Sequence, residues 1–219
     1  PQRQSLPTGG LAWAMLALAL LLVFNFFFSP GFFHLELRDG RLFGSLIDVL
    51  NRGVPVFLAA LGMTLVIATG GIDLSVGSVA AIAAATSATL IARPPDALLH
   101  GIDLHGSIAA IVLFTLGVTL IAGLWNGALV AWLDIQPIVA TLILMVAGRG
   151  LAQLLTNGQI PTFECPSFEF LGSGFLMGLP VPILIAATVL TASALLTRRT
   201  ALGLFIEAVG NNPAASRCV

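Results

Sequence analysis

Long uncharged, apolar runs alternate along this chain with shorter polar segments. A helix rises about 1.5 Å per residue, so about 20 apolar residues cross the hydrocarbon core of a bilayer. Lipid offers no partners for backbone polar groups, which favours helices in such runs. The predicted spans, about six in number, are residues 11–28, 54–70, 74–92, 107–133, 138–156 and 180–197. The predicted fold class is therefore all-α, a polytopic transmembrane helical bundle.

The polar segments indicate where the chain meets water. Residues 34–52 carry too many charges to enter lipid, which predicts an aqueous loop or an interfacial helix. The first apolar run lacks a small-x-small cleavage site and is followed by further spans, so it is interpreted as a span and not as a signal peptide. Residues 11–197 are predicted to form the transmembrane domain, with a cytoplasmic N-terminal tail at 1–10 and a cytoplasmic segment at 198–219.

Composition supports a membrane protein and excludes several other classes. Hydrophobic residues make up 58% of the chain, charged residues 9%, and the mean hydropathy is +1.03. The net charge is −1, and no basic stripe is present, so nucleic acid is not an expected partner. His100 and His105 have no third ligand at useful spacing, and the two cysteines are far apart, so neither a metal nor any other cofactor is expected.

Arginine placement predicts the orientation. Arg3, Arg198, Arg199 and Arg217 place both ends of the chain on the cytoplasmic side, and six crossings agree with that. The Arg-free loop with Glu164 and Glu169 then lies outside. Residues 34–53 depart from the rule, because this outside segment contains three arginines.

A polar, glycine-rich break at residues 69–78, with the sequence TGGIDLSVGS, separates the second and third predicted spans. Glycines let the backbone turn sharply, and Asp73 or Ser75 can cap the next helix. One interpretation is a discontinuous helix that faces a water-filled substrate path. The other is a short, capped surface loop, because the roughly 20 uncharged residues on either side of Asp73 could each span a bilayer alone.

Other polar residues lie within the later spans. Arg149 interrupts the fifth span at an insertion cost of about 2.5 to 3.5 kcal/mol, so it either holds a neighbouring helix, lines the path, or snorkels to the interface. Neutral hydrogen-bonding groups suit sugar hydroxyls, and suit contacts between helices equally well. These groups are Asn126, Gln136, Thr141, Gln153 and Asn157.

Several motifs together resemble the ribose-type permeases of carbohydrate ABC importers. The most distinctive is residues 62–77, GMTLVIATGGIDLSVG. Further motifs follow in the order and spacing of that family: Trp125-Asn126-Gly127, Gln136-Pro137, Thr141-Leu142 and Arg149-Gly150. Residues 39–52, which begin DGRLFGS, are more similar to the galactofuranose-importing members.

The resemblance implies the membrane-spanning permease subunit of an ABC importer in a bacterial inner membrane. It would form the path for a monosaccharide, galactofuranose or ribose-like, delivered by a periplasmic binding protein. A second permease copy, identical or paralogous, and a cytoplasmic ATPase would complete the transporter. This chain lacks the GxxxxGK[ST] phosphate loop and any GxSxG or HExxH motif, so we expect no catalytic residues in it.

The resemblance also implies roles for individual residues. The candidates for the translocation path are Asp73, Ser75, Asn126, Gln136, Thr141 and Arg149. Residues 207–215 are similar to the cytoplasmic segment that contacts the ATPase, although periodicity alone fits an interfacial helix equally well. The ATPase-coupling candidates are Glu207, Gly210, Asn211, Pro213, Ala214 and Ala215.

Family members continue past this segment with further spans, whereas this chain stops at Val219. We therefore expect the chain to be truncated relative to the family. A channel or a secondary transporter for a small solute is the alternative function, since either could also use Asp73 and Arg149. Dependence of uptake on ATP and on a binding protein would distinguish these alternatives.

Overall fold

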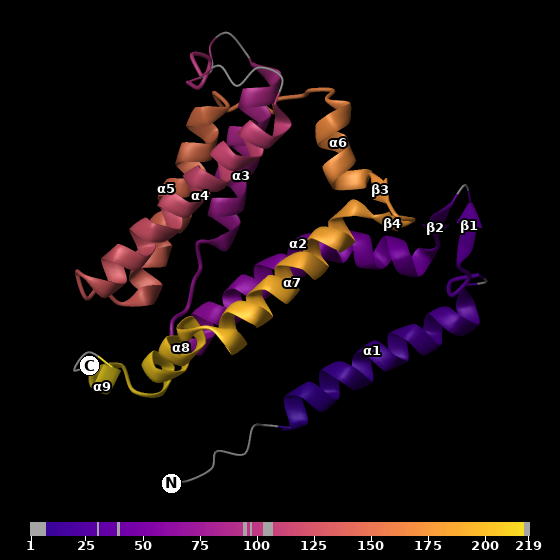
Figure 1. Ribbon diagram of the computed structural model, residues 1–219, viewed down its shortest axis with the longest axis horizontal. Coiled ribbons are helices and arrows are strands. Elements are labelled where there is room, and N and C mark those ends of the chain that lie inside the picture. The colour runs from indigo at the N-terminus through magenta and orange to yellow at the C-terminus, as the bar shows by residue number, and fades with distance from the viewer. Residues whose placement is uncertain are drawn as a thin grey trace.

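The computed structural model describes residues 8–29, 31–38, 40–93, 96, 98–102 and 107–216, and their regular structure is almost entirely helical (Figure 1). This confirms the predicted all-α class. The helices that correspond to the predicted spans are α1 (Thr8–Phe28), α2 (Ser45–Ala68), α3 (Val76–Ala92), α4 (Ile108–Ala131), α5 (Pro137–Leu155) and α7 (Val181–Arg199).

Four of these helices, α2, α4, α5 and α7, are long and apolar enough to cross a membrane. The apolar parts of the other two, Ala12–Phe28 in α1 and Val76–Ala92 in α3, are shorter. Helix α2 begins at Ser45 and not at 54, so Asp48 and Arg52 belong to its first turns. These polar residues therefore belong to the same helix as the predicted second span and not to a separate loop, with Asp48 well placed against the helix dipole.

Helices α3, α4 and α5 pack as a bundle, α2 and α7 form a pair, and α1 lies apart (Figure 1). Small residues allow α3 to approach α5 closely. A Cβ at Gly148 would lie 3.0 Å from the side chain of Ser78, whose Oγ donates a hydrogen bond to the Leu144 carbonyl at 3.1 Å. Since lipid does not drive helices together, such close backbone approach and hydrogen bonding hold the bundle.

Two short hairpins lie where α2 and α7 begin, and the sequence did not predict them. In the first, β1 (Glu36–Arg38) pairs antiparallel with β2 (Arg41–Phe43); in the second, β3 (Phe175–Leu176) pairs with β4 (Leu179–Pro180). The N–H of Leu42 donates to the Gly178 carbonyl at 2.8 Å, and Arg41 lies 5.5 Å from the centre of the Phe175 ring. The hairpins therefore tie the first ends of α2 and α7 together.

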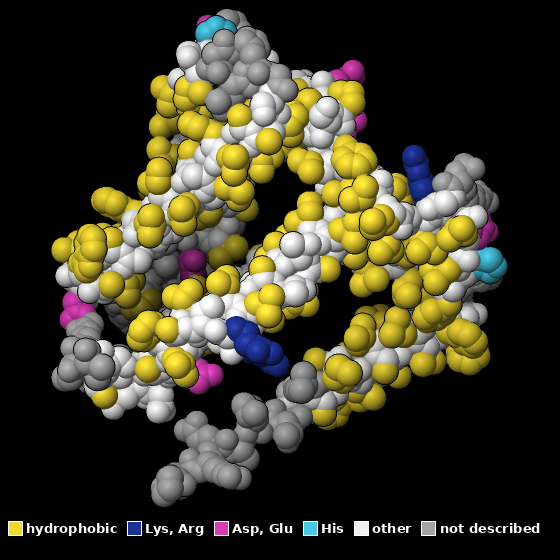
Figure 2. Space-filling model, in the orientation of Figure 1, with side chains coloured by type: hydrophobic (Ala, Val, Ile, Leu, Met, Phe, Trp, Pro, Cys, Tyr) yellow, Lys and Arg dark blue, Asp and Glu magenta, His cyan; other side chains and the backbone are white. Residues whose placement is uncertain are grey.

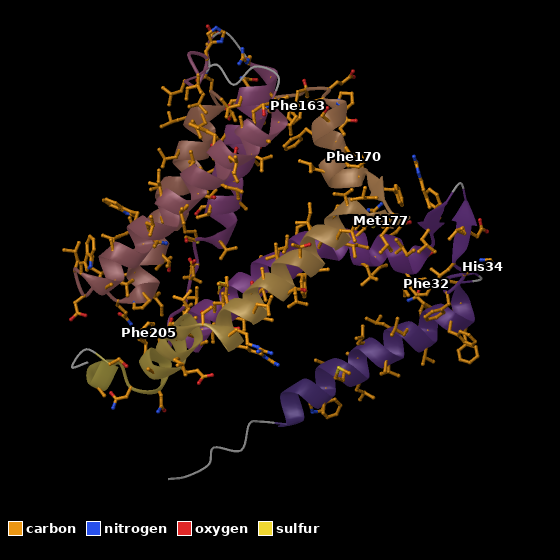
Figure 3. The ribbon with its side chains drawn as sticks, viewed as in Figure 1. Phe32, His34, Phe163, Phe170, Met177 and Phe205 are labelled. Atoms are coloured by element: carbon orange, nitrogen blue, oxygen red, sulfur yellow. The ribbon has the colours of Figure 1, made fainter. Side chains whose placement is uncertain are left out.

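The turn of the second hairpin has positive φ at both central residues, 53° at Met177 and 84° at Gly178. Such a turn matches the twist of the two strands. Figure 3 shows Met177 at this junction, with His34 on the segment before β1. The short helix α6 (Pro166–Ser173) leads into the hairpin from the α5 side (Figure 1).

Hydrophobic side chains are spread over the visible helices, with few charged side chains among them (Figure 2). Trp13 is 72% exposed and Trp132 86%, and many leucines and phenylalanines on the same helices are also exposed. An apolar surface of this extent fits a chain surrounded by lipid or by further protein. The core is small, with Ile82, Ala85 and Ala152 at its centre.

Helix α8 (Ala201–Asn211) and the short α9 (Pro213–Ser216) follow α7 at the end opposite the hairpins (Figure 1). Thr200 caps α8 by accepting a hydrogen bond from the Leu202 N–H at 3.3 Å. The first residues of α1 lie on this same side (Figure 1). The first residues of α1 and the last described residues of the chain therefore both lie away from the hairpins (Figure 1).

Candidate functional site: a polar cavity at the break between α2 and α3

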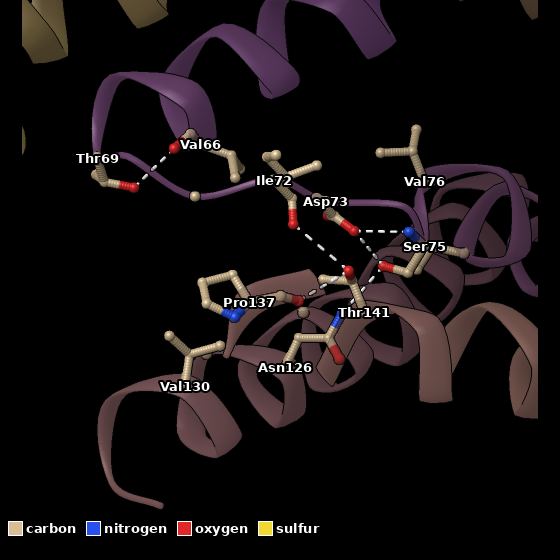
Figure 4. A pocket seen from close by; sticks show the side chains of 14 residues that line it. Val66, Thr69, Ile72, Asp73, Ser75, Val76, Asn126, Val130, Pro137 and Thr141 are labelled. Atoms are coloured by element: carbon tan, nitrogen blue, oxygen red, sulfur yellow. Dashed lines mark hydrogen bonds between the residues drawn. The ribbon is translucent and has the colours of Figure 1, made fainter. Parts of the chain in front are cut away.

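The break begins where two glycines close α2. The N–H of Gly71 donates to the Val66 carbonyl at 3.1 Å, and the N–H of Gly70 donates to the Ile67 carbonyl at 2.9 Å. This pair of bonds is the Schellman arrangement, which needs a residue of positive φ, and Gly70 has φ of 80°. Residues 69–75 then lead as a non-helical linker to α3 (Figure 4).

Asp73 organises the start of α3. Its Oδ1 accepts two hydrogen bonds from Ser75, one from the backbone N–H at 2.7 Å and one from the hydroxyl at 2.6 Å. Ser75 is the residue that precedes the helix, and its side chain makes no capping bond of its own. Of the two capping candidates, Asp73 is therefore the one that binds a backbone N–H.

Asn126 of α4 extends this interaction into a chain of hydrogen bonds. Its Nδ2 donates to the Ser75 Oγ at 3.0 Å, so the serine hydroxyl accepts from Asn126 and donates to Asp73. Ser75 and Asn126 are buried, at 1% and 8% exposure. The Oδ1 of Asn126 is also buried and has no hydrogen-bond partner within the described residues. Most buried polar atoms in proteins form a hydrogen bond, so this amide oxygen still has the capacity to accept one.

Thr141 brings α5 to the same linker. Its hydroxyl lies 2.9 Å from the Pro137 carbonyl, 3.3 Å from the Ile138 carbonyl and 3.4 Å from the Ile72 carbonyl (Figure 4). The hydroxyl has one proton, so these carbonyls share it. The contact with Ile72 places the linker between α4 and α5.

These side chains surround a cavity of about 450 Å³. Such a volume falls within the roughly 300 to 1,000 Å³ of small-molecule pockets. Its polar residues are Thr69, Asp73, Ser75, Asn126 and Thr141, and its other lining residues are Val66, Gly71, Ile72, Val76, Val79, Gly123, Gly127, Val130 and Pro137. The described residues place no cation in ion-pair contact with Asp73, so its charge is balanced only by hydrogen bonds.

The cavity lies inside the bundle, close to one of its ends. Asn126 is five residues before the end of α4 and Thr141 four residues after the start of α5, or about 6 to 8 Å along each axis. The linker thus lies near one end of the bundle, with Ser75 buried and Ile72 and Leu74 exposed. It resembles the interrupted helices whose irregular backbone is tolerated because it lines a cavity.

The structure does not bring Gln136 and Arg149 into this cavity. Gln136 precedes α5, is exposed, and lines a second hollow of about 590 Å³ that shares Thr69, Gly71, Val130 and Pro137 with the first. Arg149 is exposed further along α5, where it lines a depression with Ala81 and other small residues of α3. The described part of the chain offers it no acidic partner.

Sequence reasoning missed Ser78. This residue is 1% exposed, and its Oγ lies 2.8 Å from the Ser75 carbonyl and 3.1 Å from the Leu144 carbonyl. It therefore fixes the start of α3 against α5, beside the cavity. The available signal was its spacing of three residues from Ser75, which places both side chains on the same face of a helix.

The other group of candidates lies on α8 and α9. Glu207 and Asn211 of α8 and Ala215 of α9 are exposed, and Gly210 lies against the end of α2. The side chains of Pro213 and Ala214, like residues 217–219, lie outside the described part of the structure. The described residues contain no group of three His, Cys, Asp or Glu side chains placed to hold a metal ion.

Comparison with known proteins adds a family to this geometry. A family model described as branched-chain amino acid transport system, permease component, matches residues 45–219. The galactofuranose transporter permease of Escherichia coli K12 is 55% identical over 93% of the chain, and the fructose import permease of Bifidobacterium longum is 38% identical over 98%. The ribose import permease of Escherichia coli K12 is 33% identical over 94%.

The chain spans only part of the length of these curated relatives, 56% of the galactofuranose permease, 59% of the fructose permease and 61% of the ribose permease. No solved structure matches the chain. The matched region includes the break between α2 and α3, the α4 and α5 contacts, and the segment at α8 and α9.

Proposed function

The chain belongs to the family of permease subunits of ABC-type importers that includes the ribose and galactofuranose permeases, and we propose that it forms part of the path by which a monosaccharide enters a bacterial cell. It is a multi-pass protein of the inner membrane. The sugar is galactofuranose or a ribose-like molecule. The similarity to the galactofuranose permease, at 55% identity, favours the first of these.

The cavity at the α2–α3 break carries this proposal. A sugar offers several hydroxyl groups and a partly apolar ring, and the cavity combines a carboxylate and an amide with valine and proline side chains. The Asp73 carboxylate has no cationic partner among the described residues, and the Asn126 Oδ1 lacks a hydrogen bond. In a translocation path, sugar hydroxyls would donate hydrogen bonds to the Asp73 carboxylate. They would also donate to the Asn126 Oδ1 once the helices around it separate.

The remaining partners follow from the same family. A periplasmic binding protein delivers the sugar on the side of the hairpins, and a cytoplasmic ATPase contacts α8 and α9 through residues such as Glu207 and Asn211. The N-terminus then lies in the cytoplasm, on the side of α8. A second permease copy, identical or paralogous, completes the path, and ATP is hydrolysed on the ATPase subunit.

Uptake measurements test this function. The complete protein is expressed in Escherichia coli cells that lack their own galactofuranose permease but retain the partner ATPase and binding protein, and entry of radiolabelled galactofuranose and ribose is followed. We expect uptake of one of these sugars that disappears when the ATPase gene is deleted. Uptake that continues without the ATPase would instead identify a channel or a secondary transporter.

A further inference from the structure

Helix α8 touches the backbone at the end of α2 through a glycine. A Cβ built on Gly210 would lie 2.0 Å from the carbonyl oxygen of Ala68 and 3.6 Å from the Cα of Thr69. No side chain can occupy that space, so only glycine allows α8 to lie at this position. By contrast, a Cβ at Gly62, in the middle of α2, would meet nothing within 4 Å.

The backbone touched by Gly210 leads directly into the wall of the cavity. Thr69 and Gly71 line the cavity that holds Asp73, and the same two residues, with Gly70, line the second hollow. Val209 of α8 and Ser216 of α9 also line that hollow. Thr69 and Gly71 therefore belong to the walls of both cavities, the second of which α8 and α9 help to form.

We propose that Gly210 is a positioning residue, through which α8 sets the position of the linker at 69–75 and thereby the shape of the Asp73 cavity. The contact involves backbone on both sides, so no side chain can change rotamer to absorb a displacement of α8. Gly70 and Gly71 give the linker the freedom to move as a hinge. Asp73 and Ser75, at the far end of the linker, move with it.

This role differs from that of a residue that contacts the ATPase. Gly210 lies against the α2 backbone, and Glu207 is an exposed side chain on the same helix. The inference depends on the proposed function in one respect, which is that the ATPase moves α8 during transport. Because coupling between two sites is reciprocal, a ligand in the cavity would also change the position of α8.

Cysteine reactivity measures the link without sugar, ATPase or ATP. In the complete protein, Cys165 and Cys218 are replaced by serine and Ile72→Cys is introduced as a reporter, since Ile72 lines the cavity and is 46% exposed. The rate of reaction with a water-soluble maleimide is then measured in inside-out membrane vesicles. Gly210→Ala is the test variant and Gly62→Ala is its matched control.

We expect Gly210→Ala to change the reaction rate at position 72 about fivefold or more, the lower end of typical coupling between sites. Gly62→Ala should leave the rate at position 72 unchanged. With the reporter placed instead by Trp132→Cys, Gly210→Ala should not change the reaction rate, because Trp132 is 86% exposed and lines neither cavity. An unchanged rate in Gly210→Ala, or an equal change in Gly62→Ala, overturns the proposal.

A second variant covers the case in which Gly210→Ala does not reach the membrane. Val209→Ala shortens a side chain of α8 that lines the second hollow without creating a clash, and it should also change the rate at position 72. If it does not, the proposal is wrong. This assay contains no sugar. If the reaction rate at position 72 changes as expected but no sugar uptake is found, only the proposed function is contradicted.

Discussion

Asn126 on α4 donates a hydrogen bond at 3.0 Å to the hydroxyl of Ser75, which lies 51 positions earlier in the chain. That hydroxyl in turn donates to Asp73. Ser75 thus stands at the centre of a relay that joins two helices and the linker. Substitutions at Ser75 and at Asn126 leave different polar atoms without a hydrogen-bond partner, so their effects on stability can be compared.

Ser75→Ala should destabilise the protein more than Asn126→Leu does. The alanine leaves the buried Nδ2 of Asn126 without an acceptor, beside an Oδ1 that already lacks a donor. Leaving a buried polar group unsatisfied costs about 1 to 3 kcal/mol, whereas removing both partners is nearly neutral. Asn126→Leu removes both amide atoms, and Ser75 keeps Asp73 as its acceptor. Thermal unfolding in detergent measures the difference, and equal losses would contradict the relay.

Asp73→Asn should separate the structural and transport roles of the carboxylate. Asparagine keeps an oxygen that accepts both hydrogen bonds from Ser75, but it carries no charge. We expect the temperature of unfolding to stay within about 2 °C of the parent, in line with a small change in free energy, and sugar uptake to fall at least tenfold, about 1.4 kcal/mol in the rate-limiting barrier.

Asp73→Ala is the companion variant, since it also removes the acceptor for the Ser75 N–H. It should lower both uptake and the temperature of unfolding. Normal uptake by Asp73→Asn, at normal amounts in the membrane, would show that the charge has no role in transport. Glu169→Gln, on exposed α6, serves as a control for the loss of a negative charge.

The sequence predicted much of this arrangement because lipid restricts the chain strongly. Uncharged runs of about 20 residues can only be helices in a bilayer, and the glycine pair with Asp73 marked the break. The family, predicted from the motif at residues 62–77, is confirmed by a model that matches residues 45–219. The two hairpins were missed because strands of two or three residues are too short to show a period.

Which polar residues share the site could not be predicted from polarity alone. Thr141, Leu144 and Gly148 are buried on the α5 face that meets α3, at spacings of three and four residues. Arg149 lies eight residues beyond Thr141 on α5, about 12 Å along the helix axis, so its side chain does not line the cavity. Gln136 precedes the first turn of α5 and lines the second hollow instead of the Asp73 cavity.

Gly148→Val should loosen the packing of α3 on α5. A Cβ at this position already lies 3.0 Å from Ser78 and 3.3 Å from Ile82, so two further methyl groups must push the helices apart. Overpacking of this kind costs about 1 to 3 kcal/mol. Gly150→Val is the control, because a Cβ there would meet nothing within 4 Å. Thermal unfolding of both variants in detergent provides the comparison, and equal stability would rule out the close contact.

Glu207→Arg should weaken binding of the ATPase while leaving the permease intact. Glu207 is exposed on α8, so reversing its charge disturbs no packing within the described residues, but it places a cation where the proposed ATPase partner would meet an anion. Like charges brought together at an interface cost several kcal/mol, so we expect the amount of ATPase that co-purifies with the permease to fall at least tenfold.

The matched control for this experiment is Glu169→Arg, an equally large change of charge on exposed α6, at the other end of the molecule (Figure 1). It should leave ATPase binding unchanged, because α6 lies on the side of the hairpins. Both variants should accumulate in the membrane like the parent. Should Glu207→Arg retain the ATPase, the surface that binds it lies elsewhere than the exposed face of α8. Loss in both variants would indicate a general effect of charge and not a contact at Glu207.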